Sequence, residues 1–117
     1  MKLAEVYKLT VFVPPDSVQA VLEGILKITP LRHGRYEQVA WWSTGVTEQY
    51  LPLHDSNPTS GEPGKLSRGV SVRMEIEIPR DQDLLRRVLE EGVLPCHPWE
   101  EPAIFIQQSL TVMSSSN

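Results

Sequence analysis

The sequence has little cysteine, no long hydrophobic run and few clustered basic residues. Cys96 is the single cysteine in 117 residues, so no disulfide can form within the chain, and we expect a reducing compartment, the cytoplasm. The apolar run near the N-terminus covers only residues 9–13, which is too short for a signal peptide core or a membrane span. We therefore expect a soluble, unprocessed protein without membrane contacts.

Positive charge is also scarce. Eleven Lys and Arg residues stand against fifteen Asp and Glu residues, which gives a net charge of -4, and no basic cluster is longer than Arg86-Arg87. Because nucleic-acid binding requires dense positive charge, this composition argues against a nucleic-acid partner. The length suits one domain with its own core, which we assign to residues 1–112, followed by a mobile polar tail at residues 113–117.

Common catalytic motifs are missing. There is no Gly-x-Ser-x-Gly motif, and residues 61–66 lack the spacing and the Ser or Thr of a phosphate-binding loop. The histidines are far apart in the sequence: His33, His54 and His97. An enzyme would have to use His97 as acid or base, oriented by Glu100 or Glu101, with backbone donors from the Thr44-Gly45 turn. The sequence favours a binding module over an enzyme.

The densest chemistry lies in residues 96–102, which read Cys-His-Pro-Trp-Glu-Glu-Pro. The three prolines in and before this segment fix φ at about -65° and lack a donor N–H, so it must be a stiff, turned loop. It presents an imidazole, an indole and two carboxylates, which can form a small-ligand or metal corner. Alternatively, Trp99 closes the end of the core while His97 and the glutamates cap a strand or lie at a subunit seam.

Hydrophobic periodicity predicts alternating strands and helices. The strongest alternation, at residues 70–79, places every second side chain from Val70 to Ile78 on one face. A first helix begins after Asp16 or Ser17, and a second begins at Asp81 or Asp83 and ends at Gly92 as its C′ residue. Gly45 predicts the turn of a hairpin. The expected elements are strand 7–13, helix 18–26, strands 36–43 and 46–53, loop 54–68, strand 70–79, helix 81–91 and strand 103–112.

This order predicts an α+β fold: a ferredoxin-like antiparallel sheet with two helices on one face and an extra hairpin. Tyr50 and the pair Trp41 and Trp42 cannot all fit beneath two short helices, so we expect self-association through the open face. The loop at residues 54–68 is polar and long, which is typical of a lid or a partner-binding arm. Alternatively, it only bridges two distant strand ends.

A set of short motifs spans residues 7–106. They are Tyr7-Lys8-Leu9 with Phe12-Val13-Pro14, Gly34-Arg35-Tyr36-Glu37, Trp41-Trp42-Ser43-Thr44-Gly45, Leu51-Pro52-Leu53, Ser56-Asn57-Pro58, Gly61-Glu62-Pro63-Gly64-Lys65 and His97-Pro98-Trp99-Glu100-Glu101-Pro102-Ala103. Together they resemble the YqfO-like proteins, the stand-alone form of the domain inserted in NGG1-interacting-factor proteins. The resemblance implies a PII/CutA-like ferredoxin fold and a homo-trimer, and little about chemistry.

The chain departs from the family pattern in three places. Residues 32–35 replace an Ile-Gly-Asn pattern, Trp99 replaces a tyrosine, and residues 67–69 lack the usual acids. The metal-binding histidines and acids of the full-length proteins lie in flanking domains outside the matched range. Metal binding therefore does not carry over by resemblance.

The resemblance implies a ligand at a subunit seam, because PII-type proteins bind ligands there. We expect a small effector or a protein partner, and no resident cofactor. The expected ligand-binding residues are Trp42, Ser43, Thr44, Gly45, His97, Trp99, Glu100 and Glu101. The alternative is a zinc or copper site at His97 and Glu101, completed by His33 or His54. If Glu100 or Glu101 holds the imidazole, the pKa of His97 should be raised.

Overall fold

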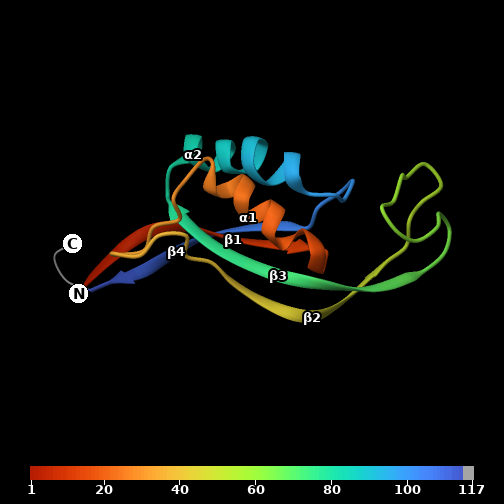
Figure 1. Cartoon of the computed structure of the whole chain (residues 1–117), viewed down its shortest axis with the longest axis horizontal. Coiled ribbons are helices and arrows are strands. Elements are labelled where there is room, and N and C mark those ends of the chain that lie inside the picture. The colour runs from red at the N-terminus through yellow and green to blue at the C-terminus, as the bar shows by residue number, and fades with distance from the viewer. Residues whose placement is uncertain (115–117) are drawn as a thin grey trace.

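The computed structural model describes residues 1–114 and shows a twisted antiparallel sheet with its helices on one face (Figure 1). The strands lie in the order β2-β3-β1-β4, and every neighbouring pair is antiparallel. This arrangement confirms the predicted ferredoxin-like α+β fold. The elements are β1 (Lys2–Val13), α1 (Val18–Leu26), β2 (Trp41–Tyr50), β3 (Ser67–Pro79), α2 (Gln82–Arg87) and β4 (Ile104–Met113).

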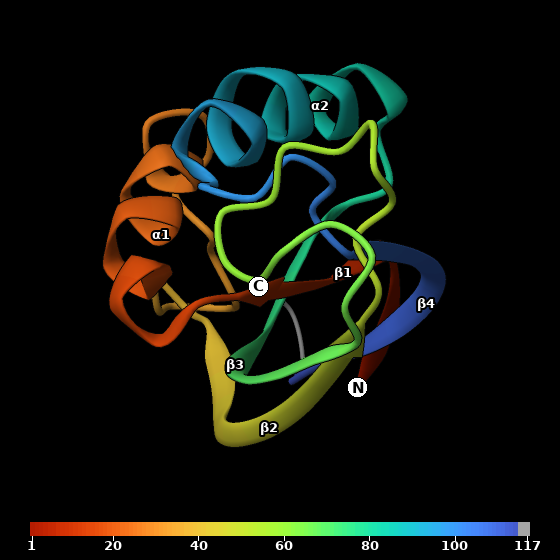
Figure 2. The same ribbon diagram turned by 90° about the vertical axis from the view of Figure 1, so that its right-hand side faces the viewer.

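The core lies between the helices and the two central strands, where alternate side chains of β1 and β3 point toward α1. Figure 2 shows α1 beside the second helical region, which begins with α2, over this part of the sheet. The predicted alternation of residues 70–79 is confirmed at the buried Val72, Met74, Ile76 and Ile78. Val70 is 59% exposed because it belongs to the arm of β2 and β3 that extends beyond the helices (Figure 1).

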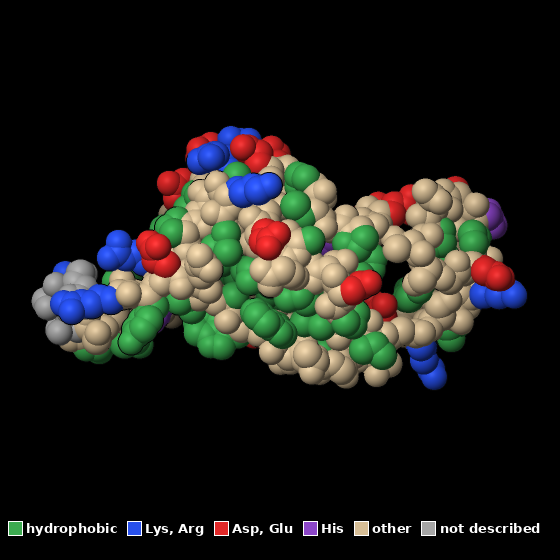
Figure 3. Space-filling view, viewed as in Figure 1, with side chains coloured by type: hydrophobic (Ala, Val, Ile, Leu, Met, Phe, Trp, Pro, Cys, Tyr) green, Lys and Arg blue, Asp and Glu red, His purple; other side chains and the backbone are tan. Residues whose placement is uncertain are grey.

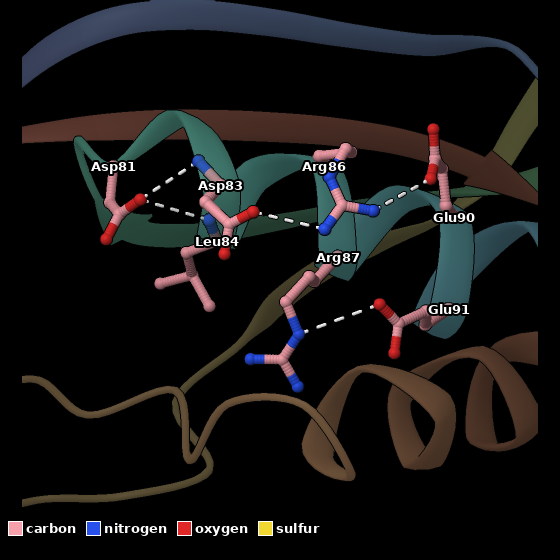
Figure 4. A network of polar contacts seen from close by, with 7 residues as sticks. All are labelled: Asp81, Asp83, Leu84, Arg86, Arg87, Glu90 and Glu91. Carbon is pink, nitrogen blue, oxygen red and sulfur yellow. Dashed lines mark hydrogen bonds and ion pairs between the residues drawn. The ribbon is translucent and has the colours of Figure 1, made fainter.

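The second helical region is longer and less regular than predicted. Asp81 caps α2 by accepting the N–H groups of Asp83 and Leu84, and ion pairs of Arg86 and Arg87 with acidic residues line the exposed side (Figure 4). The helix then widens into a π-helical turn, η2 (Val88–Val93), and tightens into a 3-10 turn, η3 (Leu94–Cys96). Gly92 was expected to end the helix, and this prediction is wrong, because Gly92 lies within η2.

Gly92 is buried against Gly24 of α1. A Cβ atom at Gly24 would lie 2.7 Å from Cys96 Sγ and closer still to the carbonyl oxygen of Gly92. Glycine is therefore required at this crossing because the two helical backbones touch there, and not because a helix ends there.

The predicted hairpin at Gly45 is also wrong. Residues 46–50 continue the same strand as residues 41–43, so β2 is one strand of ten residues. Its register against β3 shifts between Ser43 and Val46, and Gly45 has a φ of 74°. A glycine with positive φ suits a β-bulge as well as a hairpin turn, which is why the sequence pattern was ambiguous. The extra strand of the hairpin does not exist in this four-stranded sheet.

The C-terminal boundary differs slightly from the prediction. β4 extends to Met113, one residue beyond the expected domain limit, and Ser114 follows it. The remainder of the predicted mobile tail, residues 115–117, lies outside the described residues. Within residues 1–114, no helix is both long enough and apolar enough to cross a membrane.

Candidate functional site

His97 is buried at the corner between η3 and β4. Its Nε2 atom donates to the carbonyl oxygen of Phe12 at 2.7 Å, and its Nδ1 atom accepts the backbone N–H of Trp99 at 3.2 Å. The imidazole also packs against the Trp99 indole, with ring centroids 5.0 Å apart. A ring that donates with one nitrogen and accepts with the other is the neutral tautomer. His97 therefore fixes the corner to the end of β1.

The environment of His97 differs from the expected histidine-glutamate pair. Burial lowers the pKa of His97 from its usual value of 6.5, and the hydrogen bond to Phe12 opposes this shift only partly. Glu100 instead accepts the backbone N–H of Asn57 at 3.0 Å, and the Glu101 side chain is exposed. The expectation of a raised pKa is wrong, because the partners of His97 are backbone groups and not carboxylates.

The loop between β2 and β3 folds back onto this corner. Besides the Asn57 bond to Glu100, Thr59 Oγ1 donates to the carbonyl oxygen of Pro98 at 2.8 Å. The middle of the loop is held by Tyr50 at the end of β2, whose hydroxyl lies 2.8 Å from Ser60 Oγ. The bonds of Asn57 and Thr59 join segments about 40 residues apart in the sequence, so the predicted loop is more than a bridge between strand ends: it covers one side of the corner.

A pocket of about 740 Å³ lies between the end of β2, this loop and the corner. Figure 3 shows the molecule hollowed between the helical body and the loop, with acidic side chains beside the hollow. Its volume is in the usual range for small-molecule sites. Aromatic side chains contribute to its wall from three elements: Phe12 of β1, Tyr50 of β2 and Trp99 of the corner.

The pocket contains part of the predicted ligand site. Trp99, Glu100 and Glu101 all line it. His97 lies behind Trp99 and supports the wall through the contacts described above. The other predicted residues do not line the pocket. They lie at or next to the bulge of β2, just before the part of that strand that does: Trp42, Ser43, Thr44 and Gly45.

Residues 42–45 were expected in the site from the resemblance to PII-type seams, and not from their place in the hairpin. β2 runs through the bulge without turning, and its last residues, 46–50, lie next to the loop and line the pocket. The alternation of Val46, Glu48 and Tyr50 was the signal that could have identified them, since these side chains share one face of the strand. Ser71, which pairs with Val46, also lines the pocket and was missed.

A metal ion does not fit the corner as the structure has it. Both ring nitrogens of His97 are engaged by backbone groups, His33 Nδ1 is 2.6 Å from Glu77 Oε1, and His54 lies in the exposed loop. Among residues 1–114, no group of three or more His, Cys, Asp and Glu side chains is arranged to hold a metal ion. Within one protomer, the residues expected as ligands are therefore not brought together.

Comparison with known proteins places this geometry among related folds. No family model matches the chain. A "GTP cyclohydrolase 1 type 2 homolog" of Mycobacterium leprae is 29% identical over 104 residues, which are 89% of this chain and 26% of that protein. The chain thus spans about a quarter of the length of this curated relative.

Solved structures show the same relationship. A Bacillus cereus protein related to NIF3 superposes with a TM-score of 0.71 and 28% identity, over 93% of this chain and 27% of that one. The CutA1 protein of Ehrlichia chaffeensis superposes with a TM-score of 0.64 and 14% identity, over 94% of this chain and 85% of that one. CPII, a nitrogen regulatory PII-like protein from Thiomonas intermedia, superposes with a TM-score of 0.63 and 11% identity, over 97% of this chain and 99% of that one. The chain is similar in sequence to one segment of NIF3-related proteins and has a PII- and CutA-like fold.

Proposed function

We propose that this chain is a small cytoplasmic PII- and CutA-like module that assembles as a homo-trimer and binds a small effector or a protein partner at the seam between subunits. The observation that carries the proposal is the pocket at the junction of β2, the 51–66 loop and the corner. Three segments distant in sequence converge there, and hydrogen bonds hold the loop over the corner. Such convergence on a concave, partly aromatic surface is typical of a binding site.

Exposed apolar side chains on the strands support the proposed homo-trimer. Large apolar side chains on all four strands are at least 43% exposed: Leu3, Trp41, Trp42, Val70, Phe105, Ile106, Leu110 and Val112. The sheet also ends in two edge strands, β2 and β4, whose outer hydrogen-bonding groups are available for pairing. An isolated protomer would leave this apolar surface in water, and association of identical subunits covers it. Trp41 and Trp42 thus fit the expected interface role and not the core of the protomer.

Two observations support an effector that binds at a seam between subunits: the similarity of the fold to PII- and CutA-like proteins, and the pocket described above. The solved structure of CPII is bound to ADP, AMP and bicarbonate. The activity named for the Mycobacterium leprae relative belongs to a protein of which only 26% matches this chain, so it does not transfer to this chain. A zinc or copper site at His97 and Glu101 remains the alternative, and it would require the histidine to release one backbone partner.

Native mass spectrometry of protein purified without added metal or chelator tests the proposal. We expect a trimer, and we expect Leu110→Lys on edge strand β4 to dissociate it. Leu94→Lys, on the helical side, is the matched control because Leu94 is also exposed and its substitution should leave the trimer intact. A trimer carrying zinc or copper that is lost in His97→Ala would establish the metal alternative, whereas a monomeric wild-type protein would overturn the seam.

A further inference from the structure

All charged side chains that line the pocket are acidic. Four carboxylates line it, from three segments: Glu48 of β2, Asp55 of the loop, and Glu100 and Glu101 of the corner. Among the described residues that line the pocket there is no Lys, Arg or His. A concave surface concentrates the potential of its charges. This lining therefore attracts cations and repels phosphate groups.

Glu48 is the least exposed of these acids. Its side chain is half-buried and lies across Gly69 of the paired strand, so that a Cβ atom at Gly69 would be 3.0 Å from Glu48 Oε1. Burial raises the pKa of the Glu48 carboxyl, because partial removal from water disfavours its charge. A cation beside Glu48 would offset that cost.

Ser71 provides an independent sign of a ligand. The residue is fully buried and lines the pocket, yet its Oγ atom has no hydrogen-bond partner among the described residues. Buried polar atoms in native proteins are almost always hydrogen-bonded. Ser71 pairs with Val46, two residues before Glu48 on the same face of β2, so the hydroxyl and the carboxylate belong to one wall. An N–H donor in the pocket could satisfy both.

The rest of the lining indicates an organic cation and not a bare ion. No cluster of ligating side chains suitable for a metal ion occurs in residues 1–114. The pocket is instead walled by Phe12, Tyr50 and Trp99 together with aliphatic and proline side chains of the loop. Aromatic faces attract ammonium and guanidinium groups and also pack against apolar carbon. The volume of about 740 Å³ accommodates a molecule much larger than a hydrated ion.

We propose that this pocket binds a small organic cation, an amine or guanidine with an apolar body, with Glu48 and Ser71 recognising the charged N–H group and Trp99 and Tyr50 contacting the body. This inference rests on the proposed effector-binding role and specifies its ligand class. The acids of the loop and the corner lie on other segments, so a ligand with a second cationic group would reach them as well.

Isothermal titration of the wild-type protein tests the ligand class, with agmatine, spermidine and tyramine as cationic probes and ATP and AMP as anionic ones. We expect millimolar or tighter binding of at least one amine, weakened by added salt, and no comparable binding of the nucleotides. Nucleotide binding without amine binding would overturn the cation class while leaving an effector site in place. Failure of all three amines at millimolar concentration would also overturn it.

Two variants locate the site. Glu48→Gln should weaken amine binding at least tenfold, whereas Glu90→Gln, a matched change on the exposed side of the second helical region, should not alter it. Ser71→Ala should weaken binding several-fold and leave thermal stability unchanged or higher, because the hydroxyl loses no partner in the free protein. If both pocket variants bind amines normally, or if Glu48→Gln instead dissociates the oligomer in native mass spectrometry, the pocket receives a second copy of the chain and the proposal fails.

Discussion

His97 Nε2 donates a hydrogen bond of 2.7 Å to the carbonyl oxygen of Phe12, 85 residues earlier in the chain. The bond joins the end of β1 to the corner that carries Trp99, Glu100 and Glu101. Phe12 and Trp99 are both pocket residues, so His97 positions two walls of the site without being part of its lining. Its neutral form is the one that this geometry requires, since Nδ1 must accept the N–H of Trp99.

The stability of the fold should therefore depend on pH through His97. Its folded pKa is lowered below 6.5, so the unfolded chain binds the proton more readily than the folded chain. The free energy of unfolding should rise with pH through the interval between the folded pKa and 6.5, and the contribution is lost as pH falls through that interval. Each pKa unit of lowering corresponds to about 1.4 kcal/mol. Urea denaturation from pH 7.5 down to pH 5, read against the variants below, measures it.

His97→Gln removes the titrating group while keeping an amide that can bond to Phe12, and it should flatten this pH dependence. His54→Gln is the control, because His54 lies exposed in the loop, and it should retain the wild-type slope. A His97→Gln protein that shows the same slope as wild type would contradict the assignment. Glu75, whose pKa is lowered by its hydrogen bond with Lys8, would not account for such a slope, because its contribution changes only at pH values below about 4.5.

The bonds between loop and corner should control local opening of the loop. Asn57 donates to the Glu100 carboxylate, and Thr59 donates to Pro98. A single exposed hydrogen bond contributes about 0.5–1.5 kcal/mol or less, so Thr59→Val and Glu100→Ala, each of which removes one of these bonds, should leave global stability nearly unchanged. They should instead accelerate amide hydrogen exchange of residues 51–66 several-fold.

Glu101→Ala is the matched control for this loop experiment. Glu101 is the neighbouring exposed acid of the same corner, and its substitution should leave the exchange rates of residues 51–66 at wild-type values. Equal exchange in all four proteins would show that the two bonds do not hold the loop. The measurement uses hydrogen exchange followed by mass spectrometry on the full chain.

The sequence predicted the fold well because hydrophobic alternation survives in every central element. The stretch from Val72 to Ile78 faces the core as expected, and both helices begin near the predicted residues. Glycine was the main source of error. Gly45 and Gly92 were interpreted as a turn and a helix end, whereas one forms a bulge and the other a contact between helices. Local sequence does not distinguish these uses, because each depends on what packs nearby.

The site was predicted only in part for the same reason. The proline-rich corner was recognised from its composition, and Trp99, Glu100 and Glu101 do line the pocket. The opposite wall was predicted at residues 42–45 from the resemblance to PII-type seams, whereas residues 46–50 of the same strand line the pocket. Ser71 could not be identified from sequence, since an unpaired hydroxyl becomes visible only when all of its neighbours are placed. The partners of His97 are backbone groups of Phe12 and Trp99, which no residue pattern encodes.

Because of the contact between Gly24 and Gly92, we expect Gly24→Ala to lower the stability of the protein, although alanine is the better helix former. In an exposed helix, Gly→Ala stabilises by about 1 kcal/mol. At Gly24 the added methyl would meet Cys96 Sγ and the Gly92 carbonyl oxygen, so Gly24→Ala should destabilise the protein by about 1–3 kcal/mol through overpacking. Glu23→Ala, an exposed change in the same helix, should shift stability by less than about 0.5 kcal/mol. Thermal and urea denaturation measure both, and a stabilised Gly24→Ala protein would show that the helices separate without cost.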